Sequence, residues 1–192
     1  MIKKYENDLG ILNYYSKSSN FFDEYVEVGF WGAFTYPATD VMEESPYRLI
    51  LVNKAKDGAE RSCLDVPIGL LSFLGVSVYL TGSEEQLKIQ PAQSSVVSLT
   101  RYFGVEMVLS FVDCVQEQKI TRNVSNLIYR SHLLSEKDDG FFCMDIRLSD
   151  AVCYYLISEI PLYVNKEIFD NHGMSESYIL DRYGTTGEVD EL

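Results

Sequence analysis

The segment that most constrains the fold is a run of alternating side chains directly after a tight turn. Asp138-Asp139-Gly140 is typical of a turn, because glycine accepts the positive φ angles that such turns require. In residues 141–148, which follow, one row of alternate side chains is wholly apolar, whereas the other row contains Asp145 and Arg147. A period of two residues predicts a β-strand that buries one face.

Other apolar or β-branched runs predict further strands. These runs are residues 25–34, 47–53, 61–66, 76–80, 105–112, 152–157 and 177–180. The dipeptide Asp57-Gly58 lies between two of them and predicts a hairpin. Residues 119–134 fit a helix and a strand equally well, so their structure is left open.

Short helices are predicted where capping residues flank an apolar face. Asn165 is a helix cap, Ile168 and Phe169 form the apolar face behind it, and Gly173 ends the helix. Further short helices are expected over residues 67–74 (ended by Gly75), near residues 1–10 and from residue 83. Several hairpin-like strands with a few short helices predict an α+β fold with a mostly antiparallel sheet.

The chain of 192 residues predicts a single domain, residues 1–192, because no repeat or Pro/Gly/Ser-rich linker divides it. A sub-division near residue 90 is the alternative, and residues 184–192 form an acidic tail. The longest nearly apolar run, residues 67–80, is shorter than the about 20 residues that a membrane-spanning helix needs. No secretory signal is recognisable, so we expect a cytoplasmic protein.

The cysteines and histidines indicate neither a disulfide framework nor a metal site. Cys63, Cys114, Cys143 and Cys153 form no Cys-x-x-Cys pair and lie beside apolar residues. We therefore expect four reduced thiols in the core. The two histidines of the chain are 40 positions apart, and no His-x-x-x-His occurs, so we expect no metal and no cofactor.

Motifs of enzyme chemistry are absent from the sequence. It contains no Gly-x-Ser-x-Gly elbow and no glycine-rich phosphate loop. We therefore expect no catalytic residue and a protein that is not an enzyme. Asp113, Glu117 and Lys119 suggest one alternative, a Mg²⁺-dependent phosphodiesterase, although a solvated turn explains the same residues.

The strongest functional signal is charge, because 16 basic residues against 29 acidic ones leave a net charge of −13. Such a surface repels nucleic acid and attracts basic proteins. Residues 23–46 contain six acids and no base, and they include an expected exposed loop over residues 35–46. The partner-binding residues that we predict combine these acids with two aromatic residues: Asp23, Glu24, Glu27, Trp31, Tyr36, Asp40, Glu43 and Glu44.

Each of these features also has a simpler explanation. Acidic runs often serve solubility alone, and Trp31 is explained equally well by packing in the core. A second acidic excess lies at the end of the chain, where residues 167–192 carry seven acids and Arg182 as the one base.

The second half of the chain resembles one group of bacterial polymorphic-toxin immunity proteins. The similar residues are the strand 105–112 that runs into Asp113-Cys114, the segment 160–166, and the helix and closing strand up to residue 180. The resemblance covers about residues 90–183 and implies a cytoplasmic inhibitor that neutralises a cognate toxin. No binding residue is carried across from the family.

These observations predict a non-enzymatic acidic inhibitor that occludes a basic partner protein, as an immunity protein does with a bacterial toxin. A phage-type inhibitor of a nucleic-acid-targeting defence enzyme, whose acidic surface imitates phosphate charge, is the alternative within the same physical class. We expect no direct binding of nucleic acid and none to a membrane.

Overall fold

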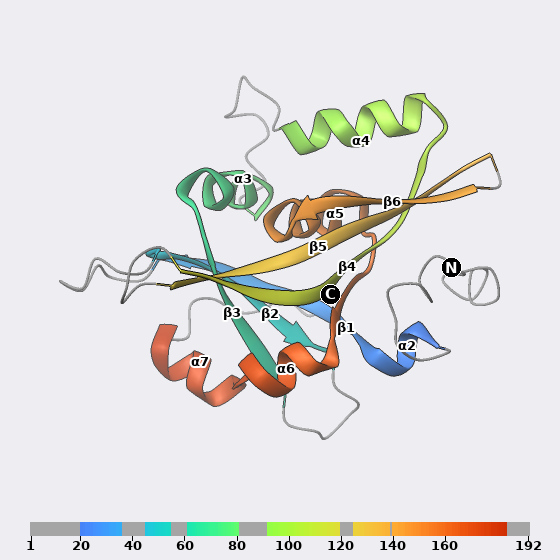
Figure 1. Ribbon diagram of the computed structural model, residues 1–192. Helices are drawn as coiled ribbons and strands as arrows, with labels where there is room; N and C mark the ends of the chain where they lie inside the picture. The colour runs from blue at the N-terminus through green and yellow to red at the C-terminus, as the bar shows by residue number, and fades with distance from the viewer. Residues whose placement is uncertain are drawn as a thin grey trace.

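The computed structural model describes residues 20–35, 45–54, 61–80, 92–119, 125–138 and 140–183. In these residues, eight strands form one sheet in the order β6-β5-β4-β7-β1-β2-β3-β8 (Figure 1). All neighbouring strands are antiparallel except β4 and β7, which are parallel. The predicted α+β fold with a mostly antiparallel sheet is therefore confirmed.

The strands are β1 (Tyr25–Thr35), β2 (Tyr47–Asn53), β3 (Ser62–Ile68), β4 (Glu106–Lys119), β5 (Ser125–Lys137), β6 (Gly140–Arg147), β7 (Leu162–Asn165) and β8 (Met174–Ser175). The helices of the described residues are α2 (Phe21–Glu24), α3 (Leu70–Leu80), α4 (Ala92–Tyr102), α5 (Leu148–Ser158), α6 (Lys166–His172) and α7 (Glu176–Tyr183). None of these helices combines the length and apolar character needed to cross a membrane.

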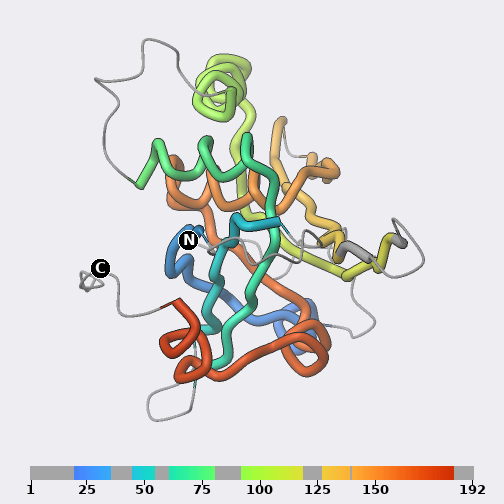
Figure 2. The backbone as a smooth tube through the Cα atoms, turned by 90° about the vertical axis from the view of Figure 1, so that its left-hand side faces the viewer, coloured from blue at the N-terminus to red at the C-terminus, as the bar shows by residue number. Residues whose placement is uncertain are grey.

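Helices lie on both sides of the sheet. Helices α3, α4 and α5 lie on one side, whereas α2, α6 and α7 lie on the other (Figures 1 and 2). This sandwiching explains why Leu49, Ile50 and Leu51 of β2 are all fully buried, although successive side chains point to opposite faces. Leu49 and Leu51 belong to the main core with α3 and α5, whereas Ile50 packs against Ile179 of α7.

Strand β7 connects the two halves of the chain. It pairs in parallel with β4, where Phe111 lies opposite Tyr163, and in antiparallel with β1, where Tyr25 lies opposite Asn165. Strand β7 has only four residues, yet it hydrogen-bonds both to β1, which precedes residue 90 in the sequence, and to β4, which follows it.

The predicted helix after β7 is confirmed with its caps. The side chain of Asn165 accepts a hydrogen bond from the backbone N–H of Glu167 at 2.9 Å. The backbone N–H of Gly173 donates to the carbonyl of Phe169 at 2.8 Å and ends the helix. A Cβ atom at Gly173 would overlap the carbonyl oxygen of Phe169 and the hydroxyl of Ser62, so only glycine fits there.

Three predicted strands are wrong, because the segments are helical. Residues 152–157 belong to α5, in which Leu148, Ala151 and Val152 are buried at the i, i+3, i+4 spacing of a helix. Residues 76–80 belong to α3 and residues 177–180 to α7. Short apolar runs do not distinguish a strand from a buried helix by periodicity, and here packing against the sheet decides.

The predicted helix over residues 67–74 is also misplaced at both ends. Pro67 is still in β3, where it lies opposite Arg48, so the helix begins only at Leu70. Gly75 does not end the helix, because α3 continues through it to Leu80. The sequence does not decide the structure of residues 119–134, and from Ser125 onward they form strand β5.

The predicted strand after residue 140 is confirmed as β6, but its buried face is not. No residue of β6 is fully buried, and Met144 of the apolar row is exposed. The reason is its position, since β6 is an outer strand of the sheet. All four cysteines are free, as predicted; Cys63 and Cys153 are buried, whereas Cys114 and Cys143 are half-buried.

Several predictions lie outside the described residues. They are the helices near residues 1–10 and from residue 83, the turn at Asp57-Gly58, most of the acidic loop over residues 35–46, and the acidic tail 184–192.

Candidate functional site

A hollow of about 210 Å³ between α2 and α6 is lined mainly by acidic residues. Two of the predicted partner-binding residues, Asp23 and Glu24, lie on its α2 side. They meet two carboxylates of α6 that the prediction did not include. The lining residues are Asp23, Glu24, Asn165, Lys166, Glu167 and Asp170.

Capping interactions place the two helices that carry these acids. Helix α2 is a single turn, and the side chain of Asn20 caps it by accepting a hydrogen bond from the N–H of Phe22 at 3.2 Å. The ammonium group of Lys166 donates to the backbone carbonyls of Asp23 at 2.5 Å and Phe22 at 3.4 Å. Lys166 therefore ties the end of α2 to the start of α6, and its positive charge suits a helix C-terminus.

Aromatic packing fixes α2 on the sheet. The Phe21 ring stacks on Tyr25 with 4.1 Å between ring centroids, and it meets the edges of Phe111 and Tyr163 at 5.7 and 5.6 Å. All four residues are buried in one cluster. The carboxylates of α2 are thus carried by a rigid base, so a partner would not have to order them on binding.

The electrostatics of the hollow favour a positively charged group. Four acidic residues line it, against one basic residue, Lys166, whose ammonium group donates to backbone carbonyls. Carboxylates gathered in a concave surface reinforce one another's potential and attract cations. The hollow is smaller than the about 300–1,000 Å³ usual for small-molecule sites, so a basic side chain of a protein suits it better than a cofactor.

The structure separates two other predicted residues from this hollow. Glu27 forms an ion pair with Lys54, whose ammonium lies 2.5 Å from its carboxylate. Trp31 is half-buried and packs against the cluster of Ile50, Cys63 and Ile179 under α7. Six positions along β1 separate Trp31 from Tyr25, which is about 20 Å at the rise of a strand. The tryptophan is therefore packed within the fold and does not border the acidic hollow.

Tyr36, Asp40, Glu43 and Glu44, the remaining predicted residues, lie outside the described residues. The acids of α6 that join the hollow belong to the second acidic excess in the sequence, over residues 167–192. That excess was the available signal for Glu167 and Asp170, but linear sequence does not show that α6 lies beside α2.

A second polar cluster, which the sequence analysis missed, lies on β4, β5 and β6. A register shift in the pairing of β4 with β5, between Val112 and Cys114, leaves Asp113 as an extra residue. Arg130 donates hydrogen bonds to the Asp113 carboxylate from two nitrogens, Nε and Nη2. Nε2 of His132 lies 3.2 Å from the same carboxylate. On its other side, Nδ1 of His132 lies 2.8 Å from Asp145.

The pKa values of His132 and Asp113 shift in opposite directions. Burial alone would lower the pKa of His132, but its contacts with Asp113 and Cys143 and the Asp113 charge raise this pKa to about 9. Burial alone would raise the pKa of Asp113, but its contact with His132 and the hydrogen bonds from Arg130 hold it well below its usual range. At neutral pH the histidine is a cation and has no free site to accept a proton, which is unsuitable for a general base.

The register of β4 does not support the alternative Mg²⁺ site. The carboxylate of Asp113 lies on the side of Arg130 and His132. Glu117 lies opposite Leu127, which packs with the main core on the other side of the sheet. Asp113 and Glu117 therefore point to opposite faces and do not converge. Among the described residues, no group of three His, Cys, Asp or Glu side chains is placed to hold a metal ion.

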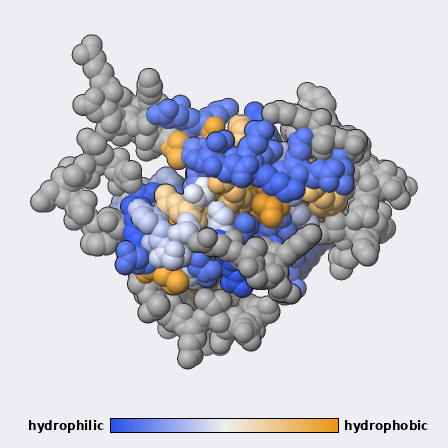
Figure 3. All heavy atoms as spheres, turned by 90° about the horizontal axis from the view of Figure 1, so that it is seen from below, coloured by the Kyte–Doolittle hydropathy of each residue, from blue (hydrophilic) through white to orange (hydrophobic). Residues whose placement is uncertain are grey.

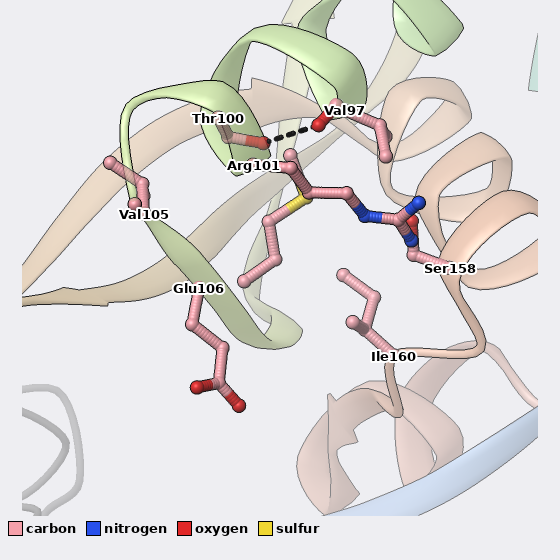
Figure 4. A pocket seen from close by; sticks show the side chains of 9 residues that line it. Val97, Thr100, Arg101, Val105, Glu106, Ser158 and Ile160 are labelled. Carbon is pink, nitrogen blue, oxygen red and sulfur yellow. Dashed lines mark hydrogen bonds between the residues drawn. The ribbon is translucent and has the colours of Figure 1, made fainter.

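A larger hollow, about 360 Å³, lies where α4 meets β4 and the end of α5. Arg101 extends across it toward Ser158, whereas Glu106 points away from both (Figure 4). Val97 and Ile160 form apolar parts of the wall of this hollow. The hydroxyl of Ser158 has no histidine among the lining residues to activate it, so the hollow lacks a nucleophile–base pair.

The surface on the side of α2, α6 and α7 is mainly hydrophilic, with small apolar patches between the polar side chains (Figure 3). In comparisons with known proteins, the chain matches no family model and no curated sequence.

Proposed function

We propose that the protein is a non-enzymatic inhibitor that binds and occludes a basic partner protein, as an immunity protein neutralises a cognate bacterial toxin. The observation that carries this proposal is the acidic hollow, in which Asp23 and Glu24 of α2 meet Glu167 and Asp170 of α6. The net charge of −13 supports it, because a strongly acidic surface steers a basic partner toward the protein.

The mode of inhibition that we propose is occlusion of a basic groove. One lysine or arginine of the partner enters the hollow. There the side chains of four acidic residues take the place of the water around its positive charge. The remaining acidic surface lies over neighbouring basic groups and blocks access to them. The same arrangement suits a toxin and a nucleic-acid-targeting defence enzyme, because both bind their substrates with clustered lysine and arginine. We place the protein in the cytoplasm, where such a partner would have to be neutralised.

The test is capture of the partner from lysate of the cells that make this protein. The full chain is immobilised at low salt, washed, and eluted with high salt, and the eluate is identified by mass spectrometry. We expect a single basic protein, because screening by salt weakens exposed charge pairs. Expression of that protein alone should be toxic or inhibit a cellular enzyme, and co-expression with this chain should restore growth.

Two variants compare the hollow with an acidic residue elsewhere on the surface. The double variant Asp23→Lys with Glu167→Lys reverses charge at the hollow and should capture no partner. Asp181→Lys changes the charge of an exposed residue on α7 and serves as the control, which should capture it normally. Capture that is lost equally in both variants, or in neither, would contradict the proposed site.

A further inference from the structure

Arg101, in the last turn of α4, is an arginine without an acidic partner in an acidic chain. Four other arginines form ion pairs: Arg48, Arg130, Arg147 and Arg182. Arg101 forms none with any described residue, although the chain carries 29 acidic residues. Its side chain extends across the hollow of about 360 Å³ beside α4, which we call the α4 hollow (Figure 4). A guanidinium has five N–H donors and no acceptor, so these donors are available to an acceptor that enters the hollow.

The backbone at the end of α4 fixes the base of this arginine. Gly104 has a φ of 68°, which favours glycine, and its N–H donates to the carbonyl of Arg101 at 3.1 Å. The N–H of Val105 donates to the carbonyl of Thr100 at 2.8 Å. Backbone donors therefore satisfy these carbonyls, and the guanidinium is not needed to cap the helix.

The wall of the α4 hollow beside Arg101 is apolar. Val97 and Ile160 are buried, and Met107 packs against the core cluster to which they belong. Glu106, the one acidic residue that lines the hollow, points away from Arg101 (Figure 4). The volume lies within the about 300–1,000 Å³ usual for small-molecule sites. A molecule that binds here meets a cation on one side and hydrocarbon on the other.

The hydroxyl of Ser158 supplies a second polar group in the wall. It is buried, and no described residue forms a hydrogen bond with it. A buried hydroxyl without a partner costs free energy, which a ligand that accepts its hydrogen bond would recover. Arg101 extends toward Ser158 (Figure 4), and its side chain is exposed, so the guanidinium has room to move and admit an acceptor between the two groups.

The charge of the α4 hollow indicates a carboxylate rather than a phosphate. Arg101 is the one basic residue among those that line it, whereas a phosphate carries more than one negative charge at neutral pH. Helices α4 and α5 both end beside the hollow, and the partial negative charge of a helix C-terminus disfavours excess negative charge. A carboxylate has a single charge and matches the planar guanidinium with two parallel hydrogen bonds.

We propose that the α4 hollow is a binding site for a small organic monocarboxylate. Its carboxylate pairs with Arg101 and accepts a hydrogen bond from Ser158, and its hydrocarbon part lies on Val97, Met107 and Ile160. Helices α4 and α5 lie on the other side of the sheet from α2 and α6 (Figures 1 and 2). The site is therefore separate from the acidic hollow and does not depend on the proposed function.

An NMR titration of the ¹⁵N-labelled full chain with hexanoate tests this proposal. We expect saturable shifts at the amides of Gly104 and Val105, with a dissociation constant of about 1 mM or tighter, as suits a ligand of so few atoms. Two matched probes separate charge from hydrocarbon. 1-Hexanol keeps the hydrocarbon without the charge, and inorganic phosphate has charge without hydrocarbon. Each should bind at least about tenfold more weakly than hexanoate.

Three variants locate the site. Arg101→Gln should weaken hexanoate binding at least about tenfold, with unchanged circular dichroism because the side chain is exposed. Arg61→Gln changes another exposed arginine without an ion pair among the described residues, and it should bind hexanoate normally. Ser158→Ala should weaken binding about threefold through the lost hydrogen bond.

The proposal would be overturned if hexanoate produced no saturable shifts at these amides. Equal affinity for 1-hexanol or for phosphate would also overturn it, because the ligand would then need no carboxylate or no hydrocarbon. Hexanoate binding that is unchanged in Arg101→Gln would show that this arginine does not hold the carboxylate.

Discussion

Two acidic sites of this protein differ in where their acidic residues lie. In the cluster on β4, β5 and β6, Asp113 and Asp145 are paired with Arg130 and His132, so two negative charges meet two positive ones. In the hollow between α2 and α6, four carboxylates meet the ammonium of Lys166, which already binds backbone carbonyls. The first arrangement joins three strands within the sheet, and the second gathers acidic residues of two helices around one hollow.

A net charge of −13 therefore does not by itself locate a binding surface. Asp113 attracted attention in the sequence as a candidate metal ligand, yet its carboxylate is satisfied within the sheet. Asp23 was one of the predicted partner-binding residues, and folding brings it beside the acids of α6, which the prediction did not include. Three changes to the compensated cluster sharpen this difference, because the same changes should leave the hollow unaffected.

The largest effect is expected for Asp113→Asn. The change removes the buried anion beside a histidine whose side chain is only 3% exposed, so this positive charge keeps only the exposed carboxylate of Asp145. We expect the free energy of unfolding to fall by about 3 kcal/mol, as for other broken buried pairs. Urea denaturation measures this loss, with Asp181→Asn as the control that should stay within about 0.5 kcal/mol of the wild type. A loss below about 1 kcal/mol for Asp113→Asn would show that the cluster does not hold the sheet together.

The pH dependence of stability is the next largest effect. The pKa of His132 is about 9 in the folded protein and 6.5 in its ordinary state, so its contribution is complete below pH 6.5 and is lost as pH rises through 9. The shift corresponds to up to about 3 kcal/mol. The Asp113 pKa is lowered, so its contribution is lost in the opposite direction, as pH falls through the acidic range.

We therefore expect the free energy of unfolding of the wild type to decline between pH 6.5 and pH 9. The decline should be much smaller in His132→Gln, which has no proton to lose at this position. Urea denaturation at a series of pH values measures both curves. Parallel curves for the two proteins would show that His132 is not the group responsible.

The smallest effect is expected for Asp145→Asn. This carboxylate lies 2.8 Å from Nδ1 of His132, closer than Asp113, but its side chain is 85% exposed. Water screens an exposed charge pair, so we expect a loss below about 1 kcal/mol in the free energy of unfolding. If Asp145→Asn were as costly as Asp113→Asn, burial would not be what distinguishes the two carboxylates.

Much of the sheet was predictable because its strands carry local signals. The strand beginning at Tyr25 and the strand Tyr47–Asn53 were recognised from their β-branched and alternating residues. Helix α6 was recognised from its cap and its glycine. Residues 152–157 alone do not distinguish a strand from helix α5, whereas the helical spacing emerges once Leu148 and Ala151 are included. Helix α3 was misread because a glycine inside a helix resembles a helix end.

The candidate site was predictable only in part. The acidity around Asp23 and Glu24 is a property of the sequence, whereas their meeting with α6 depends on β7 lying beside β1. The cluster around His132 was missed because residues 119–134 had no assigned structure. Once β5 is a strand, Arg130 and His132 fall on one face at a spacing of two, and the register with β4 brings Asp113 to them.

The most direct test of the central claim is the affinity of the captured partner for wild-type and charge-reversed protein over a range of salt concentrations. Isothermal titration calorimetry from about 50 mM to about 500 mM salt spans weak to strong screening. We expect Asp23→Lys with Glu167→Lys to weaken binding at least about tenfold at low salt and to flatten the salt dependence, with Asp181→Lys close to the wild type. Equal affinity and equal salt dependence for all three proteins would contradict the claim that the hollow between α2 and α6 binds the partner.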